Sequence, residues 1–128
     1  IILLRNKIII NKKKYNNIYH KYNNIIKMKY DKVVIKKSTN PKKKMMAVFS
    51  DSSRPNSRTK TTHFGSSGYD DYTKTKDKEQ KQRYLSRHRR NENWNDPLTA
   101  GSLSRWILWD LPSKQDSIRA YKKRFKLK

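Results

Sequence analysis

The chain has 128 residues, of which 33 are Lys or Arg and 10 are Asp or Glu, so its formal net charge is +23. It contains no cysteine, which excludes disulfides, thiolate zinc sites and thiol catalysis. It also lacks an apolar run of about 18 residues, so we expect no membrane span. A positive field of this size attracts anionic partners, of which nucleic acid is the commonest; an anionic membrane surface or an acidic protein would satisfy the same field.

The first 27 residues differ in composition from the rest. They are almost wholly Ile, Asn, Lys and Tyr, residue types with AT-rich codons, and they contain no acidic residue. One interpretation is upstream sequence translated in frame, so that the segment is disordered and the protein starts at Met28; the other is a genuine low-complexity basic arm. We favour the first, with 28–128 as a single small domain. Without the segment's seven basic residues, 28–128 still has 26 basic and 10 acidic residues, a net charge of +16.

Three short runs rich in apolar or β-branched residues predict strands in the first half of this domain. Asn40–Pro41 marks a turn between the first two runs, and Ser52–Arg58 is a loop between the second and third. Because the connections are short, we expect an antiparallel meander. The predicted strands are Tyr30–Lys37, Met45–Phe49 and Thr59–Phe64.

The second half changes to a helical pattern. The charged segment Lys74–Arg90 predicts one helix, with Thr75 or Asp77 as its N-cap. Asp96–Pro97 predicts the start of another helix, because Asp can cap and Pro tolerates the first helical position. Leu111–Pro112 is expected to end it.

A final helix is expected after Ser113, which forms a weak capping box with the acidic residue three positions later. Ile118, Tyr121 and Phe125 lie at i, i+3 and i+7, which predicts one inward face. The elements together predict an α+β fold, a three-stranded antiparallel meander followed by two to three helices packed on it. Its core is small, near the lower limit for a domain that folds alone.

Residues 63–112 contain a series of short motifs: His63-Phe64-Gly65, Gly68-Tyr69, Asp71-Tyr72-Thr73, Arg83-Tyr84-Leu85, Arg87-His88, Asn93-Trp94, Asp96-Pro97, Thr99-Ala100-Gly101, Leu103-Ser104-Arg105, Ile107-Leu108-Trp109 and Pro112. This series resembles a family of small basic proteins encoded by large nucleocytoplasmic DNA viruses of algae and protists (phycodnavirus- and mimivirus-like). The resemblance covers roughly residues 30–127 and leaves out the first 27 residues. It implies a virus-encoded protein with a role in the virion or in genome packaging, and it assigns no activity and no catalytic residue.

Three basic clusters on three predicted elements are candidates for binding phosphates. If they converge in space, they form a surface that follows a nucleic-acid backbone, and each phosphate contact adds to a steep salt dependence. The alternative is three separate solvated faces of a soluble protein. We favour binding, because the charge is well beyond what solubility needs. The candidate residues are Lys42, Lys43, Lys44, Arg87, Arg89, Arg90, Lys122, Lys123 and Arg124.

Aromatic and imidazole side chains near these clusters have both a functional and a structural interpretation. Tyr69, Tyr72 and Trp94 lie in predicted loops beside basic segments, where exposed rings would stack on bases. We favour packing on the sheet edge or core for all three. His63 and His88 lack cysteine partners, and we favour structural roles over acid–base or metal chemistry.

Acidic residues offer one catalytic alternative. Asp70, Asp71 and the triplet Glu79-Gln80-Lys81 weakly resemble a metal-dependent nuclease core, in which two acids hold Mg²⁺ and a lysine stabilises developing charge. Such a core needs its Glu and Lys on a strand, whereas here they fall in a predicted helix. Asp77 and Glu79 are better explained by the dipole of that helix.

We therefore expect a non-enzymatic protein that binds nucleic acid through the phosphate backbone with little sequence specificity, in a large DNA virus. The alternative is a minor structural virion protein that docks on acidic capsid components, and the least favoured function is a metal-dependent nuclease. We expect no cofactor and no bound metal. The expected location is the virion or the host cytoplasm or nucleus, and we do not expect secretion.

Overall fold

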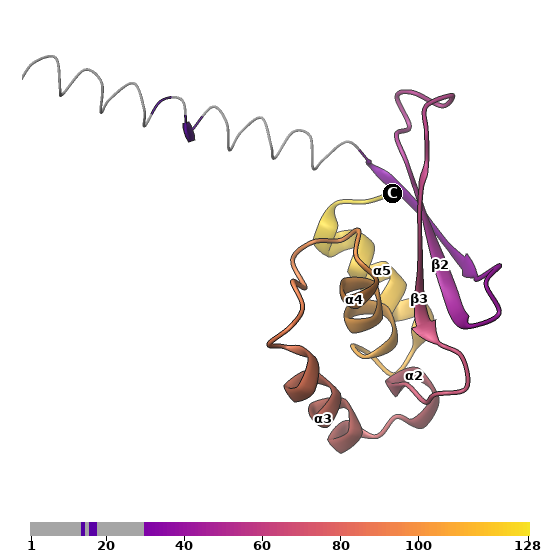
Figure 1. Ribbon diagram of the computed structural model, residues 1–128, viewed down its shortest axis with the longest axis vertical. Coiled ribbons are helices and arrows are strands. Elements are labelled where there is room, and N and C mark those ends of the chain that lie inside the picture. Colours follow the sequence, from indigo (N-terminus) through magenta and orange to yellow (C-terminus); the bar gives the residue numbers. More distant parts are fainter. Residues whose placement is uncertain (1–13, 15, 18–29) are drawn as a thin grey trace, which may run out of the picture. The chain divides into compact units, whose positions relative to one another are not determined.

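The structure is a computed structural model that describes Lys14, Asn16, Asn17 and residues 30–128 (Figure 1). The chain divides into two compact units, residues 1–30 and 31–128, and the second contains the sheet and the helices that follow it. Lys14, Asn16 and Asn17 are helical. The remaining predictions about the first 27 residues lie outside the described residues.

The three predicted strands are confirmed, and they form an antiparallel meander in the order β1-β2-β3. Hairpins join consecutive strands, and the longer one, between β2 and β3, extends beyond the sheet (Figure 1). With the helices that follow, the domain has the predicted α+β fold. The strands are β1 (Lys32–Lys37), β2 (Lys43–Ser50) and β3 (Lys60–Ser66).

One face of this sheet forms the core. Val33 lies opposite Phe49 in the register of β1 and β2, and side chains directly opposite one another share a face. Val33 is 1% exposed, and Ala47, Phe49 and Phe64 are fully buried. Each large apolar side chain buried in this way stabilises the fold by about 1.5–3 kcal/mol. The helical segments α4 (Ala100–Leu103) and η1 (Ser104–Leu108) pack against β3.

A helix within Lys74–Arg90 is confirmed as α3 (Lys78–His88), but the predicted start at Lys74 is wrong, because a separate short helix, α2 (Tyr72–Thr75), comes first. Lys76 adopts the left-handed conformation, with φ 54°, and ends α2. Asp77 then caps α3 as predicted, since its carboxylate accepts hydrogen bonds from two backbone N–H groups of the first turn at 3.0 and 3.1 Å. The chain changes direction at this left-handed residue, between α2 and α3.

The predicted helix start at Asp96–Pro97 is also wrong. Thr99 is the N-cap, accepting a backbone hydrogen bond at 3.2 Å, and α4 (Ala100–Leu103) begins after it. The Asp96 carboxylate instead accepts the N–H two residues on, at 3.0 Å, in a local turn. The helix widens into the π-helical segment η1 (Ser104–Leu108) and ends there, three residues before Leu111–Pro112.

The last helix, α5 (Lys114–Phe125), begins as predicted, because the Ser113 hydroxyl accepts a backbone hydrogen bond of the first turn at 3.2 Å. Tyr121 is 1% exposed, as expected for the inward face. Ile118 and Phe125 are only half-buried, so the expectation of a fully inward face is confirmed for the tyrosine alone. This helix packs against η1.

Candidate functional site

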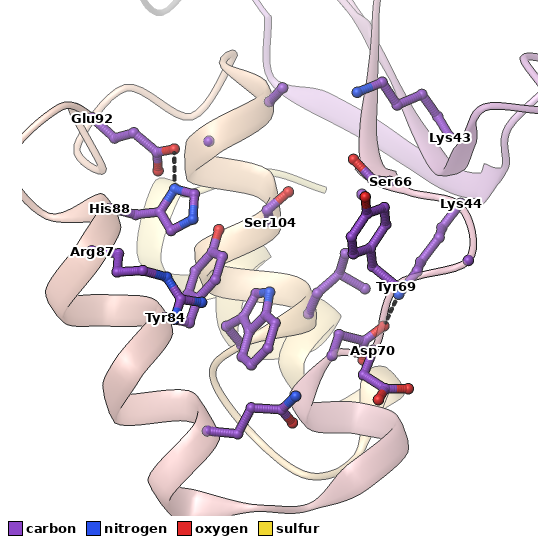
Figure 2. Close-up of a pocket in the computed structure, with 18 residues that line it drawn as sticks. Lys43, Lys44, Ser66, Tyr69, Asp70, Tyr84, Arg87, His88, Glu92 and Ser104 are labelled. Atoms are coloured by element: carbon purple, nitrogen blue, oxygen red, sulfur yellow. Dashed lines mark hydrogen bonds and ion pairs between the residues drawn. The ribbon is translucent and has the colours of Figure 1, made fainter.

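An open cavity of about 660 Å³ lies between the sheet and the helices (Figure 2). The start of β2, the end of β3 and the turn that follows form one wall; α3 and the α4–η1 segment form the other. Its volume falls within the range of about 300–1,000 Å³ that is typical of sites for small ligands.

Two of the three predicted basic clusters meet at this cavity. Lys43 and Lys44 come from β2, and Arg87 comes from α3. The other members of the predicted set lie elsewhere, so the three clusters do not converge on one cavity. Three of them are exposed but do not line the cavity: Lys42, Arg89 and Arg90. The remaining three lie on α5, where Lys123 and Arg124 line a second hollow and Lys122 does not.

The two neighbouring lysines of β2 differ in their partners. Lys44 Nζ lies 2.7 Å from Asp71 Oδ2, and this carboxylate is almost wholly buried. Burial alone would raise the pKa of Asp71, but hydrogen bonds from Lys44 and Thr73 hold that pKa below its ordinary value. Within residues 30–128, Lys43 and Arg87 form no ion pair with a carboxylate. These two are therefore the cations that the cavity offers to a ligand.

Hydroxyl groups line the space between these cations. Tyr84 and Ser104 point their hydroxyls in from the helical wall, and Tyr69 and Ser66 do so from the opposite wall (Figure 2). None of the four hydroxyls has a hydrogen-bond partner within the part of the chain that the structure describes. Burial raises the pKa of Tyr84, so its hydroxyl stays protonated and can donate to a ligand. The cavity thus offers both donors and acceptors.

A stack of three rings supports the helical wall. The centroid of Tyr84 lies 4.2 Å from that of His88, with an interplanar angle of 27°, and 4.2 Å from that of Trp109, with an angle of 5°. On the opposite wall, Tyr69 is 72% exposed, so it does not pack on the sheet edge as favoured. Tyr72 is 4% exposed and belongs to the core, as favoured from the sequence.

Glu92 fixes the rim of the helical wall. One of its carboxylate oxygens lies 2.9 Å from His88 Nδ1 and the other 2.8 Å from Trp94 Nε1. Gly101 allows this arrangement, because a Cβ at that position would lie 2.8 Å from the carboxylate carbon. His88 and Trp94 thus share one partner at the rim, and Trp94 is half-buried there.

The residues considered for nuclease chemistry lie in different surroundings, and two of them, Asp71 and Lys81, have partners elsewhere in the protein. Asp71 caps α2, and Glu79 is exposed in the first turn of α3. Lys81 Nζ donates to a main-chain carbonyl oxygen at 2.6 Å. Asp70 is exposed and lines the cavity. His63 Nδ1 lies 2.7 Å from a serine hydroxyl. Among the described residues, no group of three or more His, Asp or Glu side chains is placed to hold a metal ion.

The second hollow contains a stack of arginine on tryptophan that the sequence did not predict. The guanidinium carbon of Arg124 lies 3.6 Å from the centroid of Trp106, and that of Arg105 lies 4.2 Å from the same centroid. Arg105 also lies 5.4 Å from the ring of Trp94 and pairs with Asp110 at 3.3 Å. Burial lowers the pKa of Arg105, whereas Asp110 raises it. Both arginines therefore interact with other side chains of this protein, although Arg124 is exposed.

Residues 33–88 are similar to a family of unknown function, DUF5754. The matched residues include nearly all of the sheet together with α2 and α3, and hence most of the side chains that line the cavity. No curated protein and no solved structure matches the chain. In residues 30–128 and the few described before them, no helix is both long enough and apolar enough to cross a membrane.

Proposed function

We propose that this domain binds nucleic acid through the phosphate backbone, with little sequence specificity and without catalysing a reaction. The observation that supports the proposal is the shortage of internal partners for its cations. Among the Lys and Arg side chains of residues 30–128, the ones that pair with a carboxylate are Lys44, Arg105, Arg119 and Lys128. Apart from side chains held by other groups of the protein, such as Lys81 at a main-chain carbonyl and Arg124 on the ring of Trp106, the others are available to phosphates, whose contacts dominate affinity for nucleic acid.

The cavity is the strongest candidate for a defined phosphate contact. Lys43 and Arg87 line it from opposite walls, and unpaired hydroxyls lie between them. Arg89 and Arg90 continue the basic character of Arg87 at the end of α3. Contacts of these types fix a nucleic acid in place without reading its sequence, because they reach phosphate and sugar rather than base edges.

The test is salt-dependent binding of the full chain to a short duplex, measured by fluorescence anisotropy. We expect affinity to fall steeply as salt rises, with a slope of log K against log salt of about −0.9 for each phosphate contacted. Replacing Lys43 and Arg87 together by Gln should reduce the size of that slope by about 2. The control is Arg119→Gln, because Arg119 already pairs with Asp116; its slope should match that of the parent.

Two results would contradict the proposal. One is an affinity for DNA that does not change between low and moderate salt. The other is tighter binding to polyglutamate than to DNA at the same salt concentration, which would favour docking on an acidic protein instead.

A further inference from the structure

We infer that the cavity holds one unpaired nucleotide within a single strand of nucleic acid. This rests on the proposed nucleic-acid binding and adds to it the form of nucleic acid that this site takes. It is drawn from the size and hydroxyl lining of the cavity, from the exposed ring of Tyr69 and from the positions of Lys43 and Arg87.

The size and lining of the cavity suit more than a phosphate. A volume of about 660 Å³ is comparable with sites for whole small ligands. The hydroxyls of Ser66, Ser104, Tyr69 and Tyr84 can each donate and accept hydrogen bonds. Phosphate oxygens only accept, whereas sugar hydroxyls and the edges of bases do both. The lining therefore matches a nucleoside attached to its phosphate.

Tyr69 offers the aromatic surface on which a base would stack. Gly65, near the end of β3, and Gly68, directly before Tyr69, have φ 76° and 83°, conformations that other residues rarely adopt. A Cβ on Gly65 would lie 2.7 Å from Leu108 Cδ1, so the end of β3 packs directly on η1. Tyr69 follows three residues after this strand and is 72% exposed. Stacking on such a ring accepts any base, because every base has a flat face.

The two free cations come from opposite walls, Lys43 from the sheet and Arg87 from α3 (Figure 2). A nucleotide inside a strand has a phosphate on each side, whereas a mononucleotide has one. One cation for each flanking phosphate therefore favours a strand over a free nucleotide. In a duplex, the base is already stacked and paired, and taking it out costs a few kcal/mol. The space for the base should therefore be used by single strands and not by duplexes, whereas Lys43 and Arg87 can contact the phosphates of either.

The experiment compares a thymine oligonucleotide with a duplex of the same length, each titrated with the full chain at low and at moderate salt, and the variants are compared with the parent at the lower salt concentration. Tyr69→Ala should weaken binding to the single strand roughly tenfold, within the range for loss of one base stack, and change duplex binding less than twofold. Tyr69→Phe keeps the ring and should recover most of the lost affinity. Leu111→Ala, which removes another exposed large side chain outside the cavity, is the matched control.

The outcomes separate this inference from the proposal on which it rests. If the parent binds neither DNA in a salt-dependent manner, the proposed function fails. If the parent binds both and Tyr69→Ala weakens both equally or neither, nucleic-acid binding stands and the inference is overturned. Thymidine monophosphate is the last arm: if it displaces the oligonucleotide at equal concentration, the site takes a free nucleotide, and the assignment to a strand is wrong. Thermal unfolding of the two Tyr69 variants should match the parent, because Tyr69 is mostly exposed.

Discussion

Two basic regions of this domain use their cations in different ways. At the second hollow, Arg105 and Arg124 lie on the ring of Trp106, and Arg105 also pairs with Asp110. At the cavity, Lys43 and Arg87 have no carboxylate partner within the described residues. A buried charge needs partners from its own chain, whereas an exposed charge is compensated by water or by a ligand. The partners of a cation, rather than its presence in a cluster, therefore decide whether it stabilises the fold or binds.

Among the variants that test this comparison, Arg105→Ala should have the largest effect on stability. The side chain is 13% exposed and removing it leaves Asp110 without its ion pair, so we expect a loss of roughly 3 kcal/mol in the free energy of unfolding. Urea denaturation followed by circular dichroism measures it. Arg87→Ala is the control, since an exposed and unpaired side chain should cost less than about 0.5 kcal/mol. Equal losses in the two variants would show that the comparison is wrong.

Asp71 tests the same comparison through a carboxylate that has a cation partner. Because the pKa of Asp71 is lowered in the folded protein, its ionised form contributes stability above the unfolded pKa of about 3.9, and that stability is lost as pH falls through the folded pKa. Asp71→Asn should therefore cost about 2 kcal/mol at neutral pH, through the unpaired Lys44. The difference from the parent should shrink below about pH 4.

Urea midpoints measured from pH 3 to pH 7 test this prediction. The control is Asp70→Asn, because the neighbouring carboxylate is exposed and should affect stability little. A difference between the Asp71 variant and the parent that stays constant down to pH 3 would mean that the ion pair with Lys44 is not its cause.

The strands could be predicted because their signals are local. β1 and β2 each contain an apolar run of strand length, and Asn40–Pro41 marks the turn between them. The helix boundaries were harder to predict from the sequence. Lys76 ends α2 in a left-handed conformation that sequence associates with Gly or Asn, and Thr99 replaces Asp96 as a cap although both residue types are good caps.

The site was predicted only in part, because its partners are distant in sequence. The run Lys42–Lys44 contains no signal that Lys44 pairs with Asp71, 27 residues later, while Lys43 stays free. Ser104 and Tyr84 give no local sign that their hydroxyls face one cavity. The exposed ring of Tyr69 had a signal, the two glycines that precede it, but the same pattern is typical of ordinary turns.

The smallest effect concerns two neighbours on α5 that carry the same charge. Arg124 stacks on Trp106 at 3.6 Å, whereas Lys123 is exposed without a carboxylate partner. Arg124→Gln should cost about 1 kcal/mol of unfolding free energy through the lost cation–π contact, and Lys123→Gln less than about 0.5 kcal/mol. Thermal denaturation resolves the pair.

DNA binding by the same two variants completes the contrast. If Lys123 contacts phosphate, Lys123→Gln reduces the size of the salt slope by about 1 without loss of stability. Arg124→Lys keeps the charge but loses the planar guanidinium, so its stability should fall between those of the parent and Arg124→Gln while it binds DNA like the parent. If Arg124→Gln is instead as stable as the parent, the stack on Trp106 does not stabilise the fold, and Arg124 belongs with the cations that are free to bind.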